Sequence, residues 1–425
     1  MKVLLVTFQF APYNIVGSVR VGKMAKALKE FGHDVRVLTA APLEYPETMP
    51  LEIPAERVMQ TPWWNVNRPL YWLARKMGRA SASETYTPAT SGTGRVRSLS
   101  LLARAITNFP DGQMGWYAPA LRAGRAIMRG WKPDLVLSSA PPFTGHMIAR
   151  RLAKDASVPW IADFRDLFSE NPYTIRPTWR LNFDRWLERR VLRDAAACVT
   201  ISEPLAKSLR VHGRPVEVIL NGYDPADLPT TAPVVSDTAP VTILYTGTIY
   251  PGRRDPSPLF AAVATLGPLR DRIQLAFCGQ DLRGVQTAAA KHGVLDRLKL
   301  IPTMPYRAAL QAQAEADVLL LLLWNNPEEV GVLPAKLFEY IGAGRPILAL
   351  GLETGSAAEI IRNRDMGVVA NDPAAIAKQL RSWVEEKTIT CRIAGPAPEA
   401  KNGLSRVDQF RKLDTFLRSF VPTAS

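Results

Sequence analysis

The sequence predicts two doubly wound α/β domains joined by a linker. Short apolar runs alternate with stretches of helical periodicity along the first half of the chain, and the alternation restarts in the second half. Apolar strands separated by helices are typical of a parallel sheet that helices cover on both faces. Between the halves, residues 225–240 read PADLPTTAPVVSDTAP, and their four prolines and lack of aromatic residues are typical of a linker.

The composition is that of an ordinary globular protein. A length of 425 residues suggests two or three domains at about 150 residues each. Apolar residues make up 47%, which excludes a disordered or collagen-like chain. The three cysteines lie far apart, so we expect neither a zinc site nor a disulfide framework, and a reducing cytoplasmic location fits. The densest apolar run, residues 316–324, is far shorter than the roughly 20 residues of a membrane span.

The strands follow from short apolar runs and the helices from spacings of three and four. In the first half, we expect strands over residues 3–8, 35–39, 134–138, 160–163, 198–202 and 216–220, with a helix over 23–31 that ends at Gly32. In the second half, we expect strands over residues 242–246, 274–278, 299–301, 317–323, 346–350 and 367–370. A last helical pattern covers residues 407–420. We therefore expect domains at 1–224 and 241–402, a linker at 225–240 and a C-terminal helical segment at 403–425.

Three motifs of the first domain follow expected strands. Gly17 precedes a helix whose first turn carries Arg20, and free N–H groups beside an arginine favour an anion, although a plain turn explains the pattern as well. His146 follows the strand-end sequence LSSAPPFTG, where an imidazole serves either as a base or in packing. The third motif, WIADFRDLFSEN, crowds charged residues at a strand end, where α/β enzymes place their chemistry. Its candidate catalytic residues are Asp163, Arg165 and Asp166, and the alternative is an internal salt-bridge cluster.

The second domain opens with YTGTIYPGRRDP. Gly247 ends a strand, and Arg253 and Arg254 follow in a turn rich in glycine and proline. Guanidinium groups bind phosphate oxygens through paired hydrogen bonds, so this motif predicts a diphosphate site. The alternative is two solvated arginines.

The stretch NNPEEVGVLPAKLFEYIGAGRPIL carries the strongest signal. Pro334 suits a first helical turn, and two glycines end the helix. Lys336 and the backbone N–H groups before the helix suit a phosphate, and the carboxylate of Glu339 suits the hydroxyls of a ribose. The residues whose backbone we expect at the phosphate are Gly331, Val332 and Leu333.

No metal site is expected. The aspartates of the acid-rich loop are separated by two residues, so they do not form a DxD motif, and no His, Cys or carboxylate cluster has the spacing of metal ligands. We accordingly expect no metal and no other cofactor.

Positive charge is concentrated in residues 61–130, which contain ten basic residues and only two acidic ones. Within them, TPWWNVNRPLYWLARKMGRA has apolar residues on one helical face with basic residues among them. Such a helix either lies in an anionic membrane interface or packs on the first sheet. The residues expected at the acceptor or membrane are Trp63, Trp72, Arg75 and Lys76. Nucleic acid is not expected, because no helix-turn-helix, RNP or OB-type signature accompanies the charge.

Taken in order, several motifs resemble one enzyme family. They are GHDVRVLT, PDLVLSSAPP, DFRDLF, TISEPLAKSL, ILNGYD, LYTGTIYPGRRDP, ADVLLLLL and PAKLFEYIGAGRPIL. Together they cover nearly the whole chain and resemble the GT-B glycosyltransferases of retaining family four, and within them the branch that builds bacterial surface polysaccharides such as O-antigen, lipopolysaccharide and capsule.

The resemblance implies two Rossmann-like domains that face each other across a cleft, with the final helix crossing back to the first. It implies that the second domain binds a nucleotide-sugar donor, and among such donors it favours a UDP-sugar. In this family pattern Glu339 binds the ribose, Arg253 the diphosphate, and Gly17 lies near the phosphates and the acceptor. The implied acceptor is a saccharide or a polyprenyl-diphosphate-linked saccharide, and the implied location is the cytoplasm or the inner face of the plasma membrane.

The sequence departs from the family at two positions. The family pattern places a glutamate eight residues before Glu339, and this chain has Gly331 there. An arginine often follows the glycine that matches Gly247, and this chain has Thr248. A non-catalytic or epimerase-like protein that binds a nucleotide sugar is therefore the alternative to a hexosyl- or N-acetylhexosaminyltransferase.

Overall fold

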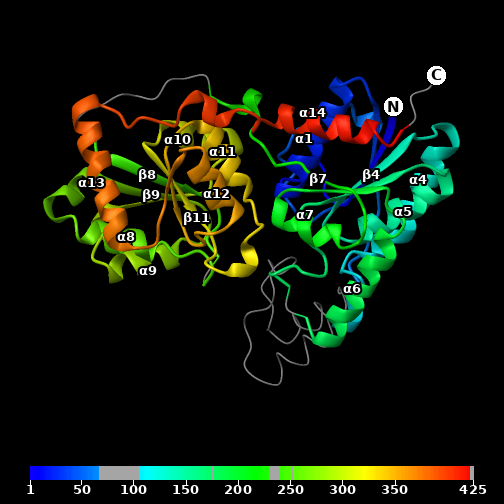
Figure 1. The fold of residues 1–425 in the computed structure, drawn as a ribbon, viewed down its shortest axis with the longest axis horizontal. Helices are drawn as coiled ribbons and strands as arrows, with labels where there is room; N and C mark the ends of the chain where they lie inside the picture. The colour runs from blue at the N-terminus through cyan, green and yellow to red at the C-terminus, as the bar shows by residue number, and fades with distance from the viewer. Residues whose placement is uncertain (67–104, 175, 230–238, 251, 422–425) are drawn as a thin grey trace. The chain divides into compact units, whose positions relative to one another are not determined.

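The computed structural model describes residues 1–66, 105–174, 176–229, 239–250 and 252–421 (Figure 1). The chain divides into two compact units, the first formed by Met1–Leu220 with Phe410–Ser425 and the second by Asn221–Gln409. Each unit contains one parallel sheet with helices between its strands. The predicted fold class of two doubly wound α/β domains is therefore confirmed.

The sheet of the first unit has the order β3-β2-β1-β4-β5-β6-β7. Its strands are β1 (Lys2–Thr7), β2 (Asp34–Ala40), β3 (Val58–Thr61), β4 (Leu135–Ala140), β5 (Trp160–Phe164), β6 (Ala197–Thr200) and β7 (Val216–Val218). Its helices are α1 (Val16–Glu30), α4 (Tyr117–Gly130), α5 (Thr144–Ala156), α6 (Thr178–Leu192), α7 (Glu203–Arg210) and α14 (Arg406–Arg418), of which α14 enters this unit at Phe410.

Alternate side chains of these strands point to opposite faces of the sheet and form two separate cores. One core joins the sheet to α4, α5 and α6, and the other joins its opposite face to α1 and α14. Figure 1 shows α14, in red, beside α1. Phe410, Leu413 and Leu417 of α14 are buried in that second core, because their spacings of three and four place them on one helical face. The predicted return of the C-terminal helix to the first domain is confirmed.

The sheet of the second unit has the order β10-β9-β8-β11-β12-β13. Its strands are β8 (Val241–Thr246), β9 (Ile273–Cys278), β10 (Leu298–Ile301), β11 (Val318–Leu322), β12 (Ile347–Leu350) and β13 (Gly367–Val369). Its helices are α8 (Ser257–Ala264), α9 (Arg283–Lys291), α10 (Tyr306–Glu315), α11 (Ala335–Ala343), α12 (Ser356–Asn363) and α13 (Pro373–Thr390). One core joins α8, α9 and α13 to a face of this sheet, while α10 and α11 pack on β8 and β11.

Most predicted elements occur within a few residues of their expected limits. The α11 helix follows Pro334 and ends at Gly344, whose φ of +69° is the left-handed cap that glycine adopts easily. The strand β3 was not predicted, because VMQT is only partly buried and lies at the sheet edge. Of the expected linker, Pro225–Asp227 forms a 3₁₀ turn, and residues 230–238 lie outside the described residues.

Candidate functional site

A buried carboxylate connects four segments at the carboxyl edge of the first sheet. Asp163 of β5 is fully buried, and its Oδ2 accepts a hydrogen bond from the Ser139 hydroxyl at 2.7 Å. Its Oδ1 pairs with the Arg20 guanidinium at 3.1 Å. Arg20 in turn donates to the carbonyl oxygens of Ile219 and Leu220. Both charged side chains are enclosed and paired with each other, so they hold the loops of this edge together.

Arg165 joins three loops beside this pair. Its guanidinium donates to the carbonyl oxygens of Ala140 at 3.0 Å and Pro141 at 2.7 Å, and both terminal nitrogens lie 3.4 Å from Gln9 Oε1. Gly17 packs directly against this group, because a Cβ at position 17 would stand 1.8 Å from Nη1 of Arg165. The structure therefore brings Gly17 and Arg165 together, but the chain's own side chains fill the space that we expected an anion to occupy.

Of the two aspartates that the sequence predicted as catalytic, Asp166 is the one that remains accessible. Its side chain is half-buried and forms no hydrogen bond within the part of the chain that the structure describes. Burial raises the pKa of this carboxyl, and the positive charge of Arg165 opposes the shift. A carboxyl with these properties is suited to accept a hydrogen bond from a substrate hydroxyl.

His146 is enclosed in the core and does not fit the expected role of a base. Its side chain is fully buried, and burial lowers its pKa to about 3. The Ser138 hydroxyl accepts from the indole of Trp160 at 2.7 Å and forms a second hydrogen bond, of 2.8 Å, with His146 Nδ1. The other ring nitrogen, Nε2, is enclosed and contacts no hydrogen-bond partner among the described residues. This neutral, aromatic-lined imidazole serves packing.

In the second unit, Gly247 and Lys336 meet at the end of β8. Gly247 has a φ of +117°, and a Cβ there would stand 2.3 Å from Nζ of Lys336. The ammonium lies 4.7 Å from the centroid of the Tyr245 ring and 3.3 Å from its hydroxyl oxygen. Glycine at position 247 thus gives the lysine its place against the strand end.

Lys336 and Arg254 place two positive charges at neighbouring strand ends. Arg254 donates to the carbonyl oxygen of Leu322, the last residue of β11, and β11 pairs with β8. Neither cation forms an ion pair with a carboxylate among the residues described. Burial lowers the pKa of Lys336 to about 8, the charge of Arg254 lowers it as well, and Glu339 opposes the shift. An anion bound here would relieve the repulsion between the two cations.

Arg253 and the backbone of residues 331–333 were also expected to contact a phosphate, and the structure shows where each of them lies. The guanidinium of Arg253 lies over the Trp324 ring, 4.8 Å from its centroid. The backbone N–H of Val332 donates to the carbonyl oxygen of Glu329 at 2.9 Å and is therefore already used by the loop. The side chain of Leu333 is buried, and the phosphate contact of its backbone N–H stays a prediction.

Glu339 lies one helical turn beyond Lys336 on α11 and is half-buried. Its Oε2 accepts a hydrogen bond at 3.1 Å from the side-chain amide of Gln313 on α10. We did not predict Gln313 as a site residue. The available signal was its spacing of three from Leu310, which places a polar residue on the buried face of that helix.

The aromatic and basic segment is only partly described. The Trp63 indole donates to the carbonyl oxygen of Pro42 at 2.7 Å, and its ring packs edge-on against Phe8 at 4.9 Å. Trp63 therefore packs on the first core, which is the second of the two alternatives for this segment, and not at an acceptor or membrane. Trp72, Arg75 and Lys76 lie outside the described residues.

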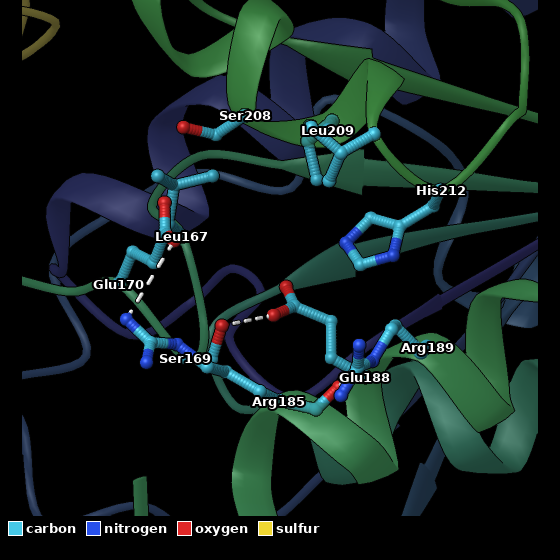
Figure 2. A pocket seen from close by; sticks show the side chains of 10 residues that line it. Leu167, Ser169, Glu170, Arg185, Glu188, Arg189, Ser208, Leu209 and His212 are labelled. Atoms are coloured by element: carbon cyan, nitrogen blue, oxygen red, sulfur yellow. Dashed lines mark hydrogen bonds and ion pairs between the residues drawn. The ribbon is translucent and has the colours of Figure 1, made fainter. Parts of the chain in front are cut away.

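A separate cavity of about 140 Å³ lies between α6 and α7 of the first unit. Figure 2 shows the Glu188 carboxylate between Ser169, which donates a hydrogen bond to it, and the ring of His212. Burial raises the pKa of Glu188 to about 7, with the Ser169 hydrogen bonds opposing the shift. Nδ1 of His212 is enclosed and contacts no partner among the described residues. The end of the acid-rich loop lines the cavity through Leu167, Ser169 and Glu170, but none of the candidate site residues does.

The described residues contain no group of three or more His, Cys, Asp or Glu side chains that could hold a metal ion. None of the described helices is long and apolar enough to cross a membrane.

Comparisons with known proteins agree with this architecture. Residues 17–222 match the family described as "Glycosyl transferase 4-like domain", and residues 232–397 match "Glycosyl transferases group 1". No curated protein matches the chain.

Solved structures match over nearly the full length of the chain. Sucrose-phosphate synthase from Thermosynechococcus elongatus is 12% identical, with 99% of this chain and 98% of that chain covered and a TM-score of 0.65. Anabaena Alr3699/HepE in complex with UDP is 14% identical, with 99% and 100% covered and a TM-score of 0.65. The lipopolysaccharide outer core galactosyltransferase WaaB is 13% identical, with 99% of both chains covered and a TM-score of 0.57.

Two doubly wound units, together with matches to two families of glycosyltransferase domains, define the class as enzymes that transfer sugars. The two family matches cover most of the sequence, in the order that this class requires. The chain belongs to the GT-B glycosyltransferases.

Replacing Gly17 tests the packing against Arg165. Gly17→Ala should lower the free energy of unfolding by about 1–3 kcal/mol, because the new methyl group displaces a guanidinium held by two carbonyl oxygens. Gly22→Ala is the matched control on the same helix, where the nearest atom to a Cβ would be 4.0 Å away. It should stabilise the helix by about 0.5–1 kcal/mol. Urea unfolding measures both, and a Gly17→Ala protein as stable as the parent would contradict the packing argument.

Glu188 should make the stability of the first unit depend on pH. Its pKa in the folded protein, about 7, lies above the ordinary value of 4.5, so the ionised carboxylate destabilises the fold. This cost is absent below about pH 4.5 and complete above about pH 7. Glu188→Gln should therefore be more stable than the parent at pH 8, by about 3 kcal/mol, and equal to it near pH 4.5.

The exposed Glu170 at the same cavity provides the control for this comparison. Glu170→Gln should change the free energy of unfolding by less than about 0.5 kcal/mol at either pH. If Glu188→Gln shows the same small change at pH 8, the carboxyl is not destabilised by burial.

Lys336 should make nucleotide binding weaken at alkaline pH. With a pKa of about 8 in the free protein, it must take up a proton to pair with a diphosphate above that pH. The dissociation constant for UDP should therefore rise about tenfold from pH 7 to pH 9. Lys336→Arg stays charged and should lose this dependence, which also controls for titration of the nucleotide. Calorimetry showing the same pH profile for both proteins would exclude Lys336 from the phosphate site.

Proposed function

We propose that this chain transfers a sugar from a UDP-sugar donor to a hydroxyl of a saccharide acceptor carried on a polyprenyl diphosphate, in the synthesis of a cell-surface polysaccharide. The observation that carries the proposal is the pair of cations, Lys336 and Arg254, at neighbouring strand ends of one unit without a carboxylate partner among the described residues. The Anabaena structure with UDP and the lipopolysaccharide galactosyltransferase WaaB, which have the same fold, support the donor class and the pathway.

The second unit binds the donor. Lys336 and Arg254 neutralise the diphosphate, with Gly247 leaving room beside the strand end and Arg253 adding a third positive charge nearby. Arginine and lysine can stabilise a leaving diphosphate without a metal ion, because their hydrogen bonds are already in place when the bond breaks. Glu339 accepts hydrogen bonds from the ribose hydroxyls.

The first unit supplies the group that meets the acceptor. Asp166 accepts a hydrogen bond from the acceptor hydroxyl, while Asp163 and Arg165 fix the loop that carries it. In a retaining reaction on one face of the sugar, the departing phosphate oxygen takes the proton of the acceptor hydroxyl. The enzyme then needs no side-chain base, which agrees with the enclosed, neutral His146.

The alternative is a protein that binds a nucleotide sugar without transferring it, or that epimerises it. Gly331 favours this alternative, because the family pattern has a glutamate at that position. Formation of a glycosylated acceptor separates transfer from both alternatives.

Turnover of a panel of UDP-sugars with a polyprenyl-diphosphate saccharide tests the proposal. We expect transfer of a hexose or N-acetylhexosamine, which persists in EDTA because no metal takes part. Asp166→Asn should lower kcat about ten- to a hundredfold with folding intact, since a charged hydrogen bond in the transition state is lost. Binding without transfer for every donor would favour the non-catalytic alternative, and unchanged kinetics of Asp166→Asn would assign the loop to structure.

Membrane attachment is tested by co-sedimentation with vesicles. Binding should require anionic lipid and fall as salt increases, since each basic residue near an anionic leaflet contributes about 1 kcal/mol. A Trp72/Arg75/Lys76 triple-alanine variant should bind less, while the packed Trp63 is left intact to preserve the core. A parent protein that stays in the supernatant with anionic vesicles at low salt would exclude a location on the inner face of the plasma membrane.

A further inference from the structure

Gln313 occupies a position where the core would accept an apolar side chain. It lies on α10, three residues after the buried Leu310, and only 1% of its surface is exposed. Burying an amide is unfavourable unless hydrogen bonds compensate for the water that it loses. The partners of this amide therefore indicate what the residue does.

The amide nitrogen of Gln313 connects two elements. It donates to Thr246 Oγ1 at 3.0 Å and to Glu339 Oε2 at 3.1 Å. A carboxylate only accepts hydrogen bonds, so the nitrogen and not the oxygen of the amide must face Glu339. The orientation of the amide is fixed by this chemistry.

The same orientation leaves the other end of the amide unsatisfied. Oε1 of Gln313 is enclosed and contacts no hydrogen-bond donor among the described residues. An unsatisfied buried acceptor costs free energy, so packing alone does not favour a glutamine here. The benefit must come from the nitrogen, which joins the Thr246 hydroxyl to the Glu339 carboxylate.

The anchor of this amide is rigid. Thr246 is the last residue of β8 and is 5% exposed. Its backbone N–H lies 3.3 Å from the hydroxyl of Tyr340, the fully buried neighbour of Glu339 on α11. Gln313 thus links the end of β8, α10 and α11 at the position of the carboxylate.

We infer that Gln313 is the positioning residue of Glu339. It holds Oε2 of the carboxylate, so that Oε1 is presented in a fixed orientation to the two ribose hydroxyls of the donor. This inference rests on the proposed function for the identity of the ligand. The role of Gln313 is to make the nucleotide site prefer ribose over deoxyribose, and it does not contact the nucleotide itself.

The preference for ribose is the property to measure, because general damage to the fold would lower the affinities for UDP and for 2′-deoxy-UDP by the same factor. Calorimetry gives the dissociation constants of UDP and 2′-deoxy-UDP for the full chain. The parent should bind UDP about tenfold more tightly than the deoxy nucleotide. Glu339→Ala should abolish the difference, and Gln313→Met, of similar size, should reduce it to within about twofold. The affinity of Gln313→Met for 2′-deoxy-UDP should stay close to that of the parent.

Leu310→Ala is the matched control, because it damages the packing of the same helix without touching Glu339. It should lower stability and keep the tenfold preference. If Gln313→Met does not fold, Gln313→Asn, whose shorter amide cannot span the distance to Glu339, serves in its place and should show the same loss.

Two results would overturn the inference, and they are distinguishable. If Glu339→Ala loses the preference while Gln313→Met and Gln313→Asn keep it, Gln313 is structural and the proposed donor site stands. If the parent itself shows no preference and Glu339→Ala binds UDP as tightly as the parent, the ribose assignment of the proposed function fails and this inference fails with it.

Discussion

The buried ion pair between Asp163 and Arg20 is the interaction on which the first unit depends. A parallel sheet brings the ends of its strands together at one edge, and the loops that leave it must be fixed to one another. Asp163 does this by accepting hydrogen bonds from β4 and α1, while Arg20 extends the contact to the segment after β7. Because the two charges compensate each other, removing either partner would leave the other buried and unpaired, which costs about 3–5 kcal/mol in comparable cases.

At the carboxyl edge of its sheet, the second unit carries positive charges that are not compensated as Arg20 is by Asp163 in the first unit. Lys336 and Arg254 contact a tyrosine ring and a carbonyl oxygen, and neither pairs with a carboxylate in the described part of the chain. An anionic ligand would stabilise cations that the fold leaves without an opposite charge. The difference between the two edges therefore supports our proposal that the second unit binds the anionic donor. In the first unit, the accessible carboxylate of Asp166 is suited to hydroxyl groups.

The alternation of apolar runs was sufficient to predict both sheets, since strands buried on both faces must be continuously apolar. The edge strand β3 was missed for the same reason, because it is only partly buried. Among the site residues, motif position predicted Lys336 and Glu339 correctly as neighbours on one helix. It could not tell that Arg165 packs against Gly17 and binds carbonyl oxygens of the chain, or that His146 is enclosed. Those outcomes depend on which side chains from distant segments fill the strand edge. Gln313 was missed because its partner lies on another helix.

A crystal structure of the chain with UDP tests the central claim most directly. The account predicts the diphosphate within hydrogen-bond distance of Lys336 and Arg254, and the ribose hydroxyls on the carboxylate oxygen of Glu339 that faces away from Gln313. A nucleotide bound elsewhere, for example in the cavity beside Glu188, or a diphosphate that contacts neither cation, would contradict it.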